Sequence, residues 1–95
     1  MDNIQERLST LEEKAIRILT GLDDIDVDSP DNHEICENAR KELREVITDI
    51  YELQKQAKTI GDYNAAREKL NISRSALRVY FHDYVSLDFV PAPKT

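Results

Sequence analysis

Tryptophan is absent from this 95-residue sequence, which has one cysteine, two glycines and three prolines, and only 6% aromatic residues. So few glycines and prolines exclude a sheet protein rich in tight turns and favour long helices. The single cysteine cannot form an internal disulfide, so nothing indicates an oxidising compartment. No apolar run approaches the roughly 18 residues that span a bilayer, and the start of the chain does not resemble a signal peptide. We therefore expect a cytoplasmic protein without a membrane segment.

Motifs of enzymes and metal sites are also scarce. There is no Gly-x-Ser-x-Gly elbow and no glycine-rich phosphate loop. His33 and Cys36 form an isolated His-x-x-Cys, which supplies too few ligands for structural zinc. Asp24 begins a run of aspartates spaced like a calcium loop, but Ser29 and Ile35 occupy the positions that need glycine and glutamate. We expect a protein that is not an enzyme and that holds no cofactor or metal.

Charged residues, by contrast, are plentiful: they make up 34% of the chain, and the net charge is -6. Their distribution is uneven, because residues 1–58 hold 8 basic and 15 acidic side chains whereas residues 59–95 hold 5 and 4. Affinity for nucleic acid comes largely from neutralising phosphates. Only the C-terminal third is therefore a candidate for contact with DNA.

Two apolar stripes with spacings of three and four predict the two main helices. The first helix is expected over residues 2–21, with Gly21 as a left-handed cap. The second is expected from a cap at Ser29 to another left-handed cap at Gly61. Ile16 and Leu19 widen the first stripe. The stripes consist of Ile4, Leu8, Leu11, Ala15, Ile18 and Leu22, and of Cys36, Ala39, Leu43, Val46, Ile50, Leu53, Ala57 and Ile60.

A short connection makes these two helices an antiparallel hairpin over residues 1–60. Two apolar stripes are more than one hairpin needs, so a homodimer through them is also expected. The connection contains five aspartates and no basic residue, which predicts a solvated loop or a binding site for a basic partner. These aspartates are Asp23, Asp24, Asp26, Asp28 and Asp31.

The rest of the chain predicts two short helices and a tail. Residues 63–70 and 74–86 have helical patterns, and residues 71–73 separate them as a turn. Residues 87–95 are expected to be extended, because apolar and polar residues alternate before two prolines. This tail could dock on its own bundle or on a partner. The expected fold is one all-α domain of four helices, a long antiparallel hairpin plus two short C-terminal helices.

A short motif occupies residues 62–84. It consists of Ala65-Ala66, then Leu70-Asn71-Ile72-Ser73-Arg74-Ser75-Ala76-Leu77, then Tyr80-Phe81. This motif resembles the helix-turn-helix of bacterial DNA-binding regulators of the TetR type. The resemblance implies a recognition helix over residues 74–84 that enters the major groove. The residues that it places toward bases or phosphates are Arg67, Lys69, Arg74, Ser75, Arg78, Val79 and His82.

Two functions remain open from the sequence. One is a small DNA-binding transcriptional regulator that uses the segment over residues 61–86 and dimerises through the hairpin. The other is an acidic helical interaction module, such as an inhibitor, a toxin-neutralising protein or a nucleic-acid mimic, that binds a basic partner through the five aspartates. Charge complementarity would speed that association.

Overall fold

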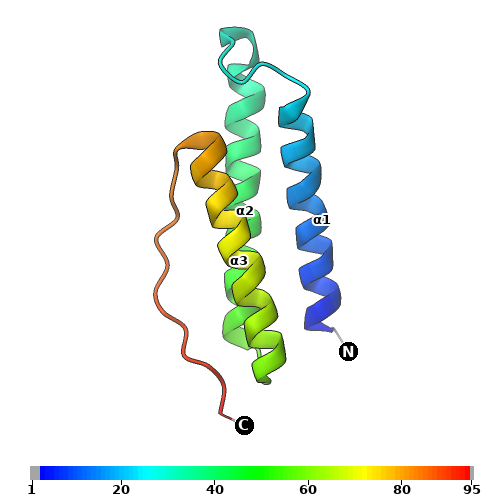
Figure 1. The fold of residues 1–95 in the computed structure, drawn as a ribbon, viewed down its shortest axis with the longest axis vertical. Coiled ribbons are helices and arrows are strands. Elements are labelled where there is room, and N and C mark those ends of the chain that lie inside the picture. The colour runs from blue at the N-terminus through cyan, green and yellow to red at the C-terminus, as the bar shows by residue number, and fades with distance from the viewer. Residues whose placement is uncertain (1–2, 95) are drawn as a thin grey trace.

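The computed structural model describes residues 3–94 and consists of three α-helices followed by an extended segment (Figure 1). The helices run up, down and up, and the C-terminal segment, residues 83–94, returns beside α3 (Figure 1). The molecule is long and flat, with extents of 51 × 26 × 15 Å. The elements are α1 (Ile4–Asp23), the 3₁₀ turn η1 (Pro30–Asn32), α2 (His33–Gln56) and α3 (Ile60–Phe81).

The prediction of two short C-terminal helices is wrong, and with it the four-helix arrangement. α3 is one helix that continues through Asn71, Ile72 and Ser73, the residues expected to form a turn. Asn and Ser each cost about 0.5 kcal/mol inside a helix, whereas burial of Leu70 and Leu77 contributes about 1.5–3 kcal/mol each. Both leucines are buried on the same face, seven residues apart, so an unbroken helix is favoured.

The two glycines do not end helices as predicted. Gly21 lies in the last turn of α1 and Gly61 in the first turn of α3, and neither has a positive φ. α2 ends earlier than expected, because the backbone of Ala57 is extended. The side chain of Thr59 then caps α3 by accepting a hydrogen bond from the Asp62 N–H at 3.1 Å, which satisfies a free donor of the first turn.

Side-chain caps begin the other two helical segments. The predicted cap at Ser29 is confirmed, because its hydroxyl accepts a hydrogen bond from the Asp31 N–H with Pro30 at the first position. This cap starts η1, which leads directly into α2. Asn3 caps α1 by accepting from the Gln5 N–H at 2.8 Å. Residue 2, the predicted start of the first helix, lies outside the described residues.

The two apolar stripes pack against each other within one chain, as the hairpin predicts, and α3 covers them. Ile60 is the exception, because this last residue of the second stripe begins α3 and is 44% exposed. Leu43 at the middle of α2 is fully buried. Because the stripes are filled internally, a homodimer would need another surface. The buried apolar residues are Leu8, Ala15 and Leu22 of α1, Leu43, Val46, Ile47, Ile50 and Leu53 of α2, Tyr63, Ala66, Leu70 and Leu77 of α3, and Val85.

The C-terminal segment docks on its own bundle, one of the two placements left open by the sequence. Val85 is buried in the core. The hydroxyl of Tyr51 on α2 donates to the carbonyl of Asp88 at 3.0 Å, and the hydroxyl of Tyr63 on α3 donates to the carbonyl of Val90. The segment therefore lies along α2 and α3. Within residues 3–94, no helix is both long and apolar enough to cross a membrane.

Candidate interaction surfaces

The residues predicted to contact DNA lie on different faces of α3. Arg67, Arg74 and Arg78 share one stripe, since they are seven and four residues apart on the helix. Lys69 lies on the side that faces α1, where it pairs with Glu12. The structure therefore brings three of the predicted residues together and separates Lys69 from them.

The other three predicted DNA contacts, Ser75, Val79 and His82, are exposed, and Val79 is exposed by 71%. Ser75 is one residue past Arg74 on α3. His82 ends α3 with a left-handed backbone, φ 52°, and its N–H donates to the carbonyl of Arg78 at 2.9 Å. Its conformation makes it a helix cap rather than the middle of a recognition helix.

The acidic loop, residues 23–31, is held by local hydrogen bonds. The carboxylate of Asp26 accepts the Asp28 N–H at 3.0 Å, and its carbonyl accepts the Asn32 side chain at 2.9 Å. All five aspartates predicted as a partner site are exposed. Nowhere in residues 3–94 do three His, Cys, Asp or Glu side chains converge on a possible metal position. The structure thus brings the five aspartates to one end of the molecule as a negatively charged surface.

Three pairs of polar side chains join α1 to α3, which run parallel. The members of each pair are 57 residues apart, so the two helices are in register. The hydrogen bond from Tyr80 to Asp23, 3.0 Å long, raises the pKa of Tyr80, and the one from Lys69 to Glu12 raises the pKa of Lys69. The pairs are Gln5–Asp62, Glu12–Lys69 and Asp23–Tyr80.

Between the second and third of these pairs lies an apolar groove of about 210 Å³, named here the α1–α3 groove. α1 and α3 each pack more closely on α2 than on each other. A channel therefore remains between α1 and α3, on the side away from α2. The fully buried Leu43 of α2 forms its floor. Ile16 and Ile72, on opposite walls, expose 54% and 59% of their surface. The other lining residues are Glu12, Ala15, Leu19, Lys69, Ser73 and Ala76.

The rim of this groove is mainly acidic. Glu12 and Glu13 lie one helical turn before Ile16, and Glu68 lies one turn before Ile72. Asp23, paired with Tyr80 one helical turn beyond Leu19 and Ala76, adds a carboxylate on the side of the acidic loop. Sequence reasoning missed the groove, because it assigned Ile16 to the core and Ile72 to a turn. A signal was present in the sequence, because Ile16 directly follows the buried Ala15 and Ile72 directly precedes the buried Ser73, so both lie beside the core stripe.

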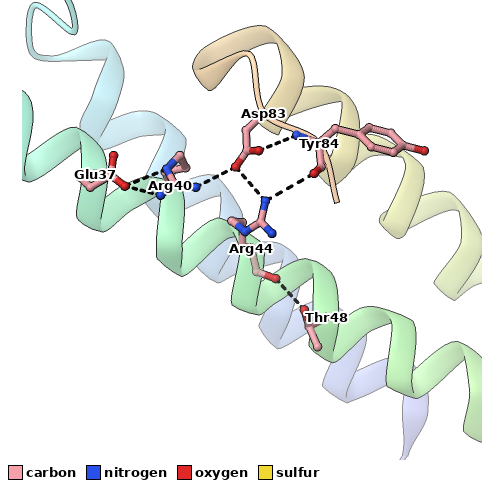
Figure 2. A network of polar contacts seen from close by, with 6 residues as sticks. All are labelled: Glu37, Arg40, Arg44, Thr48, Asp83 and Tyr84. Atoms are coloured by element: carbon pink, nitrogen blue, oxygen red, sulfur yellow. Dashed lines mark hydrogen bonds and ion pairs between the residues drawn. The ribbon is translucent and has the colours of Figure 1, made fainter. Parts of the chain in front are cut away.

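A cluster of ion pairs ties the C-terminal segment to α2 (Figure 2). One carboxylate oxygen of Asp83 accepts from Arg40 at 2.9 Å and from Arg44 at 2.8 Å, and the other accepts the Tyr84 N–H at 2.8 Å. Arg40 also pairs with Glu37, one turn earlier. The hydrogen bond from Arg40 is the main cause that lowers the pKa of Asp83, and likewise that of Glu37.

The fold defines an up-down-up three-helix protein with a docked C-terminal segment. No protein-family model, curated protein or solved structure matches the chain. The arguments on function therefore depend on the surfaces described above.

Proposed function

We propose that this chain is a non-enzymatic interaction module whose α1–α3 groove binds an amphipathic helix of a partner protein with basic residues beside its apolar face. The observation that carries the proposal is an apolar groove with an acidic rim. Its walls expose two isoleucines, Ile16 and Ile72, by more than half each. Large apolar side chains that remain exposed in one groove are typical of surfaces that bind another protein.

The shape of the groove supports a helical occupant. Its walls are two parallel helices, and the residues that line them run from Glu12 to Leu19 on α1 and from Lys69 to Ala76 on α3. Seven residue steps along a helix correspond to about 10 Å, or about two helical turns. A partner helix of that length presents apolar residues at spacings of three and four, which is how amphipathic helices occupy such grooves.

The charge of the rim supports a basic partner. Among the described residues that line the groove, Lys69 is basic, and its charge is matched by Glu12, with which it pairs. Glu13, Glu68 and Asp23 leave the rim negative, and the acidic loop extends this charge beyond the upper end. Lys and Arg side chains beside the apolar face of a partner would complement it and would speed association.

Insertion of a recognition helix into DNA is not part of this proposal. The resemblance to a helix-turn-helix needs a turn at residues 71–73, where α3 is continuous. It also needs Lys69 on the surface that meets phosphates, whereas Lys69 pairs with Glu12 across the groove.

A displayed library of helical peptides tests the proposal. Each peptide has the same two-turn apolar face, and its flanking positions are randomised between Lys and Glu. We expect selection on the full chain to enrich peptides with basic flanks, because only these complement the rim. Failure to enrich any peptide, or enrichment of acidic ones, would contradict the proposal.

Substitutions in the groove locate the binding. The double variant Ile16→Ser/Ile72→Ser should weaken binding of an enriched peptide at least tenfold, since each isoleucine contributes about 1.5–3 kcal/mol when buried. Ile35→Ser is the matched control, because Ile35 is 53% exposed on α2 and does not line the groove. Equal loss in both, measured by fluorescence anisotropy with folding checked by circular dichroism, would place binding elsewhere. Self-association that the double variant abolishes would make a second copy the occupant and refute the proposal.

A further inference from the structure

A second surface of α3 faces the C-terminal segment, on the side away from the groove. It contains the arginine stripe, Arg67, Arg74 and Arg78, with Asn71 between the first two. Arg74 and Arg78 line a hollow of about 230 Å³ together with Asn71, Ser75 and Tyr84. Tyr84 comes from the C-terminal segment, so docking of that segment completes the hollow.

The arginines of this hollow differ from those on α2. Arg40 and Arg44 share the carboxylate of Asp83. Arg74 and Arg78, by contrast, have no carboxylate within ion-pairing distance in the part of the chain that the structure describes. Two unpaired guanidinium groups side by side are notable in a chain with a net charge of -6, because acidic partners are abundant elsewhere on it.

Tyr84 holds these guanidinium groups in place. The guanidinium carbon of Arg74 lies 4.7 Å from the centre of the Tyr84 ring, and that of Arg78 lies 5.5 Å from it. Arg74 also donates one hydrogen bond to the Tyr84 hydroxyl. Its Nε is buried and has no hydrogen-bond partner among the described residues. Stacking on an aromatic ring orders the planar fork of arginine before a ligand arrives and so reduces the entropy lost on binding.

We infer that this hollow binds a single phosphate group. Its lining offers many hydrogen-bond donors, from Arg74, Arg78, Asn71 and Ser75, and no carboxylate. One arginine fork is enough for the two oxygens of a carboxylate, whereas two forks with further neutral donors suit the larger number of oxygens on a phosphate. The hollow has room for a phosphate, because its volume of about 230 Å³ is several times the roughly 30 Å³ that one water molecule takes.

The charge of the whole molecule favours a small phosphate compound over a polyanion. The net charge of the chain is -6. A long nucleic acid would extend beyond the two arginines over a negatively charged molecule, whereas a single phosphate needs only the hollow itself. A free phosphate or a mononucleotide avoids the resulting repulsion. This inference is independent of the α1–α3 groove.

Titration of the full chain with inorganic phosphate at constant ionic strength, followed by two-dimensional NMR, tests the inference. We expect saturable shifts of the Asn71, Ser75 and Arg78 amides with phosphate but not with chloride. Arg78→Gln should weaken binding about tenfold, the effect of one lost charge-assisted hydrogen bond. Arg67→Gln is the matched control, because Arg67 is exposed on the same stripe but does not line the hollow, and it should leave the affinity within about twofold.

Two further probes distinguish the sources of the phosphate. Adenosine monophosphate should bind with the same dependence on Arg78 as inorganic phosphate. A single-stranded oligonucleotide should bind no more tightly than the mononucleotide. Absence of saturable phosphate shifts, or equal effects of Arg78→Gln and Arg67→Gln, would overturn the inference. Tighter oligonucleotide binding that depends on both Arg67 and Arg78 and falls steeply with salt would also overturn it, because a polyanion would then be the ligand.

Discussion

At Gly61 the backbone is helical, and a methyl group added to its Cα would meet no atom within 4 Å. We predict that Gly61→Ala raises the free energy of unfolding by about 0.4–1 kcal/mol, because alanine restricts the unfolded chain more than glycine does. Urea unfolding followed by circular dichroism measures this. Gly21→Ala should change stability in the same direction, because Gly21 also lies inside a helix with free space around it. A loss of stability in either variant would indicate the left-handed caps that the sequence suggested.

Leu43 is the residue at which the three helices meet. It is fully buried, and it also forms the floor of the α1–α3 groove. We predict that Leu43→Ala lowers the free energy of unfolding by about 2–5 kcal/mol, the combined cost of lost burial and of a cavity. Ile35→Ala, at a position 53% exposed on the same helix, should change it by about 0.5 kcal/mol or less. Similar costs at the two positions would show that Leu43 is not at the centre of the core.

At the scale of elements, the C-terminal segment is the part whose docking depends most on charge. The hydrogen bond from Arg40 lowers the pKa of Asp83 below its ordinary 3.8. A carboxylate whose pKa is lowered in the folded state stabilises the docked segment at pH values above the ordinary pKa, and this contribution is lost as the pH falls through the lowered one. The contact between Asp83 and the two arginines is therefore expected to weaken only in acid.

We predict that Asp83→Asn increases amide hydrogen exchange in residues 84–90 at neutral pH. The difference in exchange free energy between the variant and the unchanged chain should disappear as the pH falls well below 3.8, because Asp83 itself is then protonated. Asp88→Asn is the matched control, since the segment is held there by the Asp88 carbonyl rather than its side chain. A difference that persists unchanged in acid would mean that the carboxylate does not hold the segment.

The same elements show what the sequence could predict. The hairpin of α1 and α2 follows from two stripes that repeat at spacings of three and four, and up to Leu53 the local pattern and the packing agree. In α3 they disagree, because Asn71 and Ser73 have the local preferences of a turn whereas Leu70 and Leu77 are buried on one continuous face. Burial of the two leucines outweighs the turn preferences of Asn71 and Ser73, and this burial is seen only in the three-dimensional structure.

The candidate sites were less predictable still. The α1–α3 groove lies between two parallel helices whose register is seen in the partners that Gln5, Glu12 and Asp23 reach 57 residues away. The proposed phosphate hollow includes Tyr84, which the C-terminal segment brings onto α3. No local pattern encodes either relation. The basic character of the arginine stripe, in contrast, was visible in the sequence.

For the whole molecule, the flat shape determines which surfaces remain for partners. With extents of 51 × 26 × 15 Å, α2 is covered by α1 on one side and by α3 with the C-terminal segment on the other (Figure 1). The two proposed binding surfaces lie on opposite sides of α3, the groove toward α1 and the hollow toward the C-terminal segment. A ligand at one surface therefore leaves the other accessible.

We predict that the chain alone is a monomer of 11.0 kDa at micromolar concentrations. A stable dimer needs about 1,200–2,000 Å² of buried surface with an apolar centre. Most of the residues of the stripes that could supply it are already buried inside the chain, and the exposed isoleucines are divided among the groove, Ile35 on α2 and Ile60 at the start of α3. Sedimentation equilibrium over a wide concentration range measures the mass. A dimeric mass in the unchanged chain that returns to a monomeric one in Ile35→Ser would show that the start of α2, rather than the groove, is where two copies meet.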